Sequence, residues 1–442
     1  MPGKATPSKL SDGQIQRVSS ISAGVLLGLA LLKFGNPVIF DRLVERPGTV
    51  IEAIFQPWPI LWGYCLLGGI TLLGVTSIQF TVAVPSWIKF LPILWLGWQG
   101  LSALRTVNPD LTRVTLLHFA SCVVWFYLGL FALSRMSNSQ SLWMGLVAGL
   151  VLVLWFGFEQ HYGGLEATRR FFYEQPNWKE FPPEYLKRMS SDRIFSTLVY
   201  PNALAGVVLL LLPGALVVSW QWGQHLPRIL RTVLVGSLAY LGSACLVWSG
   251  SKAGWLIALV MAMAWLAQIA VPGKFKVVMA VVVAVVGLTA FATRFAPYFN
   301  KGATSVGARF DYWKAAAMAA KEHPMLGTGP GTFSVTYAKT KPPEAEMARL
   351  AHNDYLEQAS DSGIIGALSY FIFVAGALGY LYRQRSRDFG SLSFAVWIGL
   401  LGWALQAFVE FPLYIPALAW PAFVLMGWAL GRSASTGRSI PA

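Results

Sequence analysis

The sequence predicts an all-α protein that crosses a membrane about twelve times. Of its 442 residues, 55% are hydrophobic and only 12% are charged, whereas soluble domains carry about 25% charged residues. The apolar residues form long continuous blocks, such as 204–218 and 277–290, whereas strands of an outer-membrane barrel would alternate apolar and polar residues. Composition and pattern therefore exclude a soluble enzyme, a disordered chain and a barrel.

Hydropathy divides the chain into spans of about 20 residues. The first apolar block is short and interrupted by Lys33, and no small-residue cleavage site follows it, so we expect an uncleaved helix rather than a signal peptide. The predicted spans are 19–36, 57–78, 85–104, 113–134, 141–160, 197–219, 229–249, 253–271, 275–294, 363–382, 391–409 and 414–431.

The charge distribution predicts that both termini are cytoplasmic, because cytoplasmic loops carry an excess of Lys and Arg. With this orientation, 14 of the 34 Lys and Arg but only 2 of the 20 Asp and Glu face the cytoplasm. The net charge of +14 is thus explained by topology, and we expect no nucleic-acid partner. Cys65, Cys122 and Cys245 lie in apolar blocks, which argues against a disulfide framework and a metal site.

Three regions follow from these spans. Residues 1–294 hold spans one to nine and an outer loop at about 161–196, residues 295–362 form a large helical periplasmic loop, and residues 363–442 hold the last three spans and a cytoplasmic tail. Structureless loops as long as the two outer ones are uncommon unless they are functional. We therefore expect the chemistry at the outer face of the membrane.

The large loop begins with a predicted helix over Ala308–His323, which Pro324 ends. The sequence LGTGPGTF follows at Leu326–Phe333. A glycine-rich turn can bind phosphate through its backbone N–H groups, but the Lys-Ser/Thr pair of a nucleotide P-loop is missing. A tight turn is the favoured interpretation.

Four side chains at the outer face are candidates for a site. His352 precedes an amphipathic pattern that runs into the tenth span, and it is either a surface or capping residue or a base for a hydroxyl proton. Arg193 is either an interfacial residue or a ligand, and Arg309 is a further cation at the outer face. Lys252 lies in a very short turn, WSGSKAGW, where a cation is costly unless it is paired or faces water. Cations with no metal-ligand cluster suggest neutralisation of a phosphate-type leaving group.

Aromatic residues of the first outer loop have two interpretations. They either pack in the loop or an interfacial belt, which is the usual position of Trp and Tyr, or they stack on sugars. These residues are Phe171, Phe172, Tyr173, Trp178, Phe181 and Tyr185.

Four segments together resemble the O-antigen ligase and O-antigen polymerase superfamily of bacterial inner-membrane glycosyltransferases. In chain order they are Arg193–Asn202 (RIFSTLVYPN), Ser249–Trp255 (SGSKAGW), Ala308–Phe333 and His352–Gly366 (HNDYLEQASDSGIIG). Each motif alone is weak, but all four in this order on the outer face make a fairly specific match from about residue 190 onward.

The resemblance implies a metal-independent, inverting transferase with a GT-C-like membrane fold and no cofactor. The donor would be a glycan on undecaprenyl pyrophosphate, and the acceptor a sugar hydroxyl of lipid A–core. The family histidine matches His352 and the pyrophosphate-binding arginines match Arg193 and Arg309, so His352 and Arg309 are the expected catalytic residues. Relatives often have Arg where this chain has Lys252, and lysine lacks the bidentate fork of arginine.

Two other functions stay open at this point. A polymerase would use a second lipid-linked repeat as acceptor, and both branches share the predicted span count and loop. A transporter of lipid-linked glycans would also need a polar cavity, but transporters tend to place their unusual residues at mid-membrane, whereas here they gather at one face.

Overall fold

The computed structural model describes residues 12–75, 78, 80–136, 139–174, 178–180, 186, 189–300, 302, 304–384 and 391–436. All regular elements in this part of the chain are helices. Seven of them are long and apolar enough to cross a membrane, and three more apolar helices are shorter. The predicted class, an all-α multi-pass membrane protein, is therefore confirmed.

A helix lies at each of the twelve predicted span positions in the described residues. These helices are α1 (Asp12–Lys33), α3 (Ile60–Val75), α4 (Ser86–Ala103), α5 (Pro109–Phe131), α6 (Gln140–Glu159), α9 (Pro201–Trp222), α10 (Arg228–Trp248), α11 (Lys252–Leu266), α12 (Gly273–Asn300), α15 (Asp354–Gln384), α16 (Leu392–Gln406) and α17 (Pro416–Thr436). The number of crossings itself stays a prediction, because seven of these helices meet the length and hydropathy of a full span.

The remaining helices are short or lie between the apolar ones. They are η1 (Val38–Leu43), α2 (Val50–Phe55), η2 (Leu133–Arg135), η3 (Gln160–Gly164), α7 (Leu165–Glu174), η4 (Trp178–Glu180), η5 (Ser196–Leu198), η6 (Gly223–His225), α13 (Thr304–Glu322), α14 (Phe333–Thr340) and η7 (Pro412–Tyr414). The helix expected at Ala308–His323 is α13, and it ends just before Pro324 as expected.

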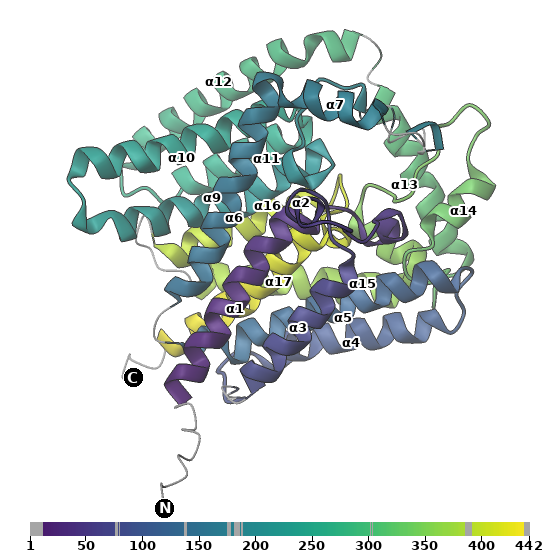
Figure 1. Ribbon diagram of the computed structural model, residues 1–442, viewed down its shortest axis with the longest axis horizontal. Coiled ribbons are helices and arrows are strands. Elements are labelled where there is room, and N and C mark those ends of the chain that lie inside the picture. The colour runs from purple at the N-terminus through teal and green to yellow at the C-terminus, as the bar shows by residue number, and fades with distance from the viewer. Residues whose placement is uncertain are drawn as a thin grey trace, which may run out of the picture.

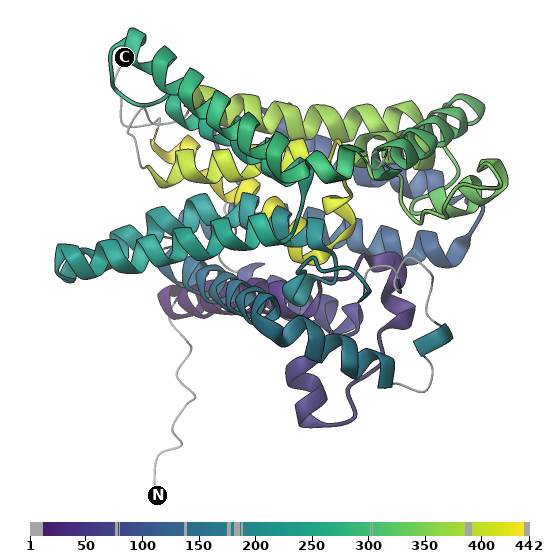
Figure 2. The same cartoon turned by 90° about the horizontal axis from the view of Figure 1, so that it is seen from above.

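Different helices lie at the two ends of the bundle. The start of α1 and the end of α17 lie at the same end, while α7, α13 and α14 lie at the opposite end in both views (Figures 1 and 2). This arrangement agrees with an even number of crossings and with both long loops on one side. We call the side of α13 and α14 the outer end.

The helices differ in how deeply they are packed. In the centre, α17 packs on α5, α6 on α1 and α16 on α9, and α17 contributes fully buried aromatic side chains such as Trp420 and Phe423. At one edge α12 exposes its apolar side chains, with Val277 63% and Val285 58% exposed. Such a surface fits a lipid-facing helix.

The first outer loop packs on itself where the structure describes it. Phe172 lies in a small apolar cluster with Leu165, Met189 and Phe195, and Tyr173 makes an edge contact with Trp178, their ring centroids 5.2 Å apart. These contacts favour the loop-packing interpretation for Phe172, Tyr173 and Trp178. Phe181, Tyr185 and the side chain of Phe171 lie outside the described residues.

Candidate active site

A cavity of about 1460 Å³ opens among the helices and loops of the outer end. Its lining includes all four residues that the sequence singled out, Arg193, Lys252, Arg309 and His352. They come from four different elements: the segment before α9, the start of α11, α13 and the segment before α15. The fold thus brings together residues that are far apart in the chain.

Arg193 joins the first two motifs. Its Nε donates a hydrogen bond to the backbone oxygen of Ser249 over 2.7 Å, and its Nη2 donates to Oδ1 of Asn202 over 2.6 Å. Gly250 follows with φ 59°, and a Cβ atom there would lie 3.2 Å from Arg193 Nε. The turn between α10 and α11 therefore needs glycine for its backbone angle and for the close approach of the guanidinium.

Lys252 begins α11, whose first turn is capped by the hydroxyl of Ser251 accepting the N–H of Gly254. The Nζ atom of Lys252 lies 3.7 Å from the ring centroid of Tyr298 and 5.4 Å from that of Phe295, both on α12. Among the described residues no carboxylate forms an ion pair with it. Cation–π contacts hold this ammonium group at the cavity wall.

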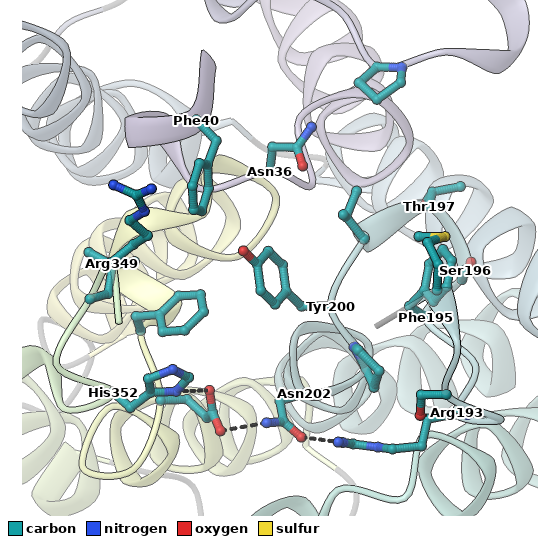
Figure 3. A pocket seen from close by; sticks show the side chains of 18 of the residues that line it. Asn36, Phe40, Arg193, Phe195, Ser196, Thr197, Tyr200, Asn202, Arg349 and His352 are labelled. Carbon is teal, nitrogen blue, oxygen red and sulfur yellow. Dashed lines mark hydrogen bonds and ion pairs between the residues drawn. The ribbon is translucent and has the colours of Figure 1, made fainter. Parts of the chain in front are cut away.

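Glu410, in the connection between α16 and α17, links the other groups. Its Oε1 accepts hydrogen bonds from Nη2 of Arg309 and from Nδ2 of Asn202, and its Oε2 lies 3.0 Å from Nδ1 of His352. Because Asn202 also binds Arg193, one network runs from Arg193 to His352 along the cavity (Figure 3). The Glu410 side chain is only 5% exposed, against 28% for His352.

The charges around Glu410 keep it ionised. Burial alone would raise the pKa of Glu410, but Arg309, His352 and Arg193 outweigh burial and lower that pKa from its ordinary value of 4.5 to about 2. An ionised carboxylate can only accept hydrogen bonds. The ring nitrogen Nδ1 of His352 must therefore carry the proton of this bond, which leaves Nε2 as the nitrogen available to a substrate.

Backbone strain is concentrated at the same cavity. In the described chain, three residues other than glycine have positive φ: Ser196 at 56°, Val199 at 62° and His352 at 52°. All three line the cavity. A β-branched residue such as Val199 rarely adopts this conformation, and strained residues of this kind cluster at active sites and ligand clamps.

The glycine-rich sequence Leu326–Phe333 forms a tight turn, as expected. Gly327, Gly329 and Gly331 have positive φ. The N–H of Gly329 donates to the backbone oxygen of Asp361 over 2.8 Å, and the N–H of Gly331 donates to the side-chain Oδ2 of Asp361 over 2.6 Å. These N–H groups are occupied within the protein, so the turn supports α15 and is not a phosphate cradle.

The residues 237–371 match the model of a family described as O-antigen ligase. The resemblance to the O-antigen ligase and polymerase superfamily is confirmed. No curated protein matches the chain. Lys252, Arg309 and His352 lie inside the matched region, whereas Arg193 and Glu410 lie outside it and reach the site through the tertiary structure.

Sequence reasoning missed Glu410 as a member of the site. The signal available for it was its position: it is an acidic residue at the outer end of an apolar helix, directly after the predicted span 391–409. Ionisable residues at such positions usually mark functional sites. In the described residues no group of three or more His, Cys, Asp or Glu side chains is arranged to hold a metal ion.

Proposed function

We propose that this protein is a glycosyltransferase of the O-antigen ligase type, which moves a glycan from undecaprenyl pyrophosphate to a sugar hydroxyl of lipid A–core. The observation that carries the proposal is the Glu410 network, which joins one histidine and two arginines at a single cavity. By the charge prediction, this cavity faces the periplasm from the inner membrane of a bacterium, with both termini in the cytoplasm.

His352 supplies the base in the proposed reaction. Its Nε2 takes the proton of the acceptor hydroxyl while the hydroxyl oxygen forms a bond to the anomeric carbon of the donor sugar. The bond from that carbon to the pyrophosphate oxygen breaks in the same step, so the configuration inverts and the electron pair leaves with the pyrophosphate. Glu410 stabilises the imidazolium that forms. General base catalysis of this kind contributes roughly 10²–10⁴-fold.

The arginines take up the charge of the leaving group. Arg309 donates to Glu410 through Nη2, while its buried Nε has no partner in the described structure. Arg193 is held through Nε and Nη2, so its orientation toward the cavity is fixed. Guanidinium groups suit phosphate oxygens because their donors lie in one planar fork. Lys252 adds charge from the neighbouring wall, and the activated donor itself provides the driving force.

The decisive experiment is transfer in vitro with the purified full chain in lipid nanodiscs. The donor is a labelled glycan on undecaprenyl pyrophosphate, offered with lipid A–core or with a second lipid-linked repeat, in buffer containing EDTA. We expect a single block transferred to lipid A–core without added metal. Stepwise extension of the lipid-linked repeat would show a polymerase instead, and flipping of the donor without transfer would show a transporter.

The variant that tests the mechanism is His352→Ala. We expect transfer to be abolished while binding of the donor is largely retained, because the pyrophosphate contacts remain. His323→Ala is the matched control, since His323 is an exposed histidine at the end of α13 that does not line the cavity. Full activity of His352→Ala would remove the histidine from the mechanism.

A further inference from the structure

A further cation lies in the cavity, away from the Glu410 network. Arg349 belongs to the segment between α14 and α15 and lines the cavity. Figure 3 shows it across the cavity from Arg193, with its guanidinium pointing away from His352. The sequence did not single out this residue, and the mechanism above makes no use of it.

The backbone around Arg349 is firmly anchored. Its neighbours Ala348, Leu350 and Ala351 are 5%, 2% and 0% exposed. The N–H of Ala351 donates to Oε2 of Glu357 over 2.8 Å. Because Arg349 lies three residues before His352 in this anchored segment, its side chain starts from a fixed position beside the base.

The guanidinium of Arg349 has no partner within the described part of the protein. No hydrogen bond or ion pair involves it, and its Nε is buried without an acceptor. Lys33, another cation of the cavity lining, differs because its Nζ donates to the backbone oxygens of Ile54 and Gln56. A guanidinium carries five donors and no acceptor, and leaving buried donors unpaired is costly. Arg349 is thus prepared for an anion from outside the chain.

The position of Arg349 decides which substrate brings that anion. The leaving pyrophosphate already has Arg193, Arg309 and Lys252, and a base that accepts a hydroxyl proton must lie between donor and acceptor. On the basis of the proposed function, we propose that Arg349 binds a carboxylate or phosphate group of the acceptor glycan and thereby directs the acceptor hydroxyl toward Nε2 of His352.

The carboxylates that line the cavity sharpen this selection. Glu45, Glu159, Asp311 and Glu344 are among the lining residues, and like charges repel an anion that is not paired with a cation. An acidic acceptor group is therefore favoured at Arg349 and disfavoured beside these carboxylates. The attraction at Arg349 and the repulsion by the carboxylates together favour one orientation of the acceptor, in addition to a higher affinity.

The test compares acceptors that differ only in charge. Transfer by the full chain in nanodiscs is measured with lipid A–core, with the same acceptor after alkaline phosphatase treatment, and with the acceptor whose carboxylates are amidated. For Arg349→Gln we expect the KM for lipid A–core to rise about 10- to 100-fold, as for loss of a charge-assisted hydrogen bond, with the donor KM unchanged. For Arg349→Lys we expect a KM for lipid A–core between that of the wild type and that of Arg349→Gln.

The modified acceptors identify the chemical source of the anion. If Arg349 binds phosphate, phosphatase treatment weakens the acceptor for the wild-type protein and abolishes its difference from Arg349→Gln; if it binds a carboxylate, amidation does so. Arg105→Gln is the control, because Arg105 is exposed near the outer end of α4 and lies outside the cavity.

Two results would overturn the inference. One is an acceptor KM that Arg349→Gln leaves unchanged with all three acceptors, and the other is a rise in the donor KM alone, which would place the anion on the donor. Both presuppose transfer by the wild-type protein. Absence of any transfer by the wild type to lipid A–core would instead refute the proposed function, and the inference with it.

Discussion

The two flanks of the cavity hold their charges in different ways. On the flank of α13, α15 and the α16–α17 connection, Arg309 and His352 share the buried carboxylate of Glu410. On the flank of α11 and α12, Lys252 rests on the aromatic rings of Tyr298 and Phe295. On the first flank, Glu410 lies between the deeply buried helices α16 and α17, whereas α12 exposes its apolar face at the edge of the bundle (Figure 1).

This difference shows on which flank the positions of the side chains are fixed and on which flank the protein supplies only a positive charge. A buried carboxylate that loses its partners is strongly destabilising, so the positions of Arg309 and His352 are tightly coupled to each other. A cation over aromatic rings keeps its charge available and is held by weaker forces. We therefore expect substitutions on the first flank to affect catalysis most, and those on the second flank to cause graded changes.

Apart from His352→Ala, which should abolish transfer, Glu410→Ala should have the largest effect among substitutions of the cavity lining. It leaves Arg309 and Asn202 without their shared partner and frees the tautomer of His352, so we expect a loss in kcat of roughly 10²–10⁴-fold, comparable to loss of the orienting acid in a catalytic triad. Glu410→Gln keeps the shape of the side chain, but it should still lose most of the glycan-transfer activity.

The control for Glu410 is Glu322→Gln, an exposed glutamate at the end of α13. Initial rates of glycan transfer and the thermal unfolding temperature are measured for each variant. A Glu410→Gln protein with the wild-type kcat would contradict the positioning role of the carboxylate and would remove the contrast between the two flanks.

Arg309→Lys should cause the next largest effect. Lysine keeps the positive charge but loses the planar fork that binds Glu410 and that, in the proposed mechanism, also binds the pyrophosphate. We expect kcat/KM for the donor to fall about 10- to 100-fold, measured in the nanodisc transfer assay. Lys314→Ala, an exposed substitution on the same helix, should leave transfer unchanged; equal activity of Arg309→Lys and the wild type would refute the pyrophosphate role.

Lys252→Ala should have a smaller effect, about 3- to 10-fold on the donor KM, because it removes one cation that sits over aromatic rings and supports the two arginines. Lys252→Arg should keep or improve donor binding, since arginine adds a bidentate fork. A loss in kcat as large as that of Glu410→Gln would show that this flank also enforces geometry.

The smallest effect is expected for the dependence of the unfolding temperature on acidic pH. The folded-state pKa of Glu410 is about 2, below its ordinary value of 4.5, so its ionisation stabilises the fold above pH 4.5 and this contribution is lost as the pH falls toward 2. The difference in unfolding temperature between wild type and Glu410→Gln should therefore narrow as the pH falls from 4.5 toward 2. A difference that stays constant over this acidic range would contradict an ionised Glu410.

Much of the fold could be predicted because its signals are local. A long apolar run must form a helix in a membrane, since every backbone group has to be paired inside the segment. The short helices η1 and α2, between the first two predicted spans, were not predicted, because six residues carry too little periodicity to distinguish a helix from a loop.

The site could be predicted only in part, for a related reason. His352, Arg193, Arg309 and Lys252 belong to motifs whose residue types indicate their chemistry. Glu410 is separated by 101 residues from Arg309 and by 208 from Asn202, and no local pattern connects them.

From the order of residues alone came the membrane class, the expectation that the chemistry lies at the outer face, and a set of cations with one imidazole. Folding decided which of these groups touch: it gave His352 and Arg309 a common carboxylate, left Nε2 of His352 for the substrate, and kept Arg349 without a partner among the described residues. The reason is physical, because hydropathy acts along one segment at a time, whereas hydrogen bonds and ion pairs depend on distances that exist only after distant helices have packed.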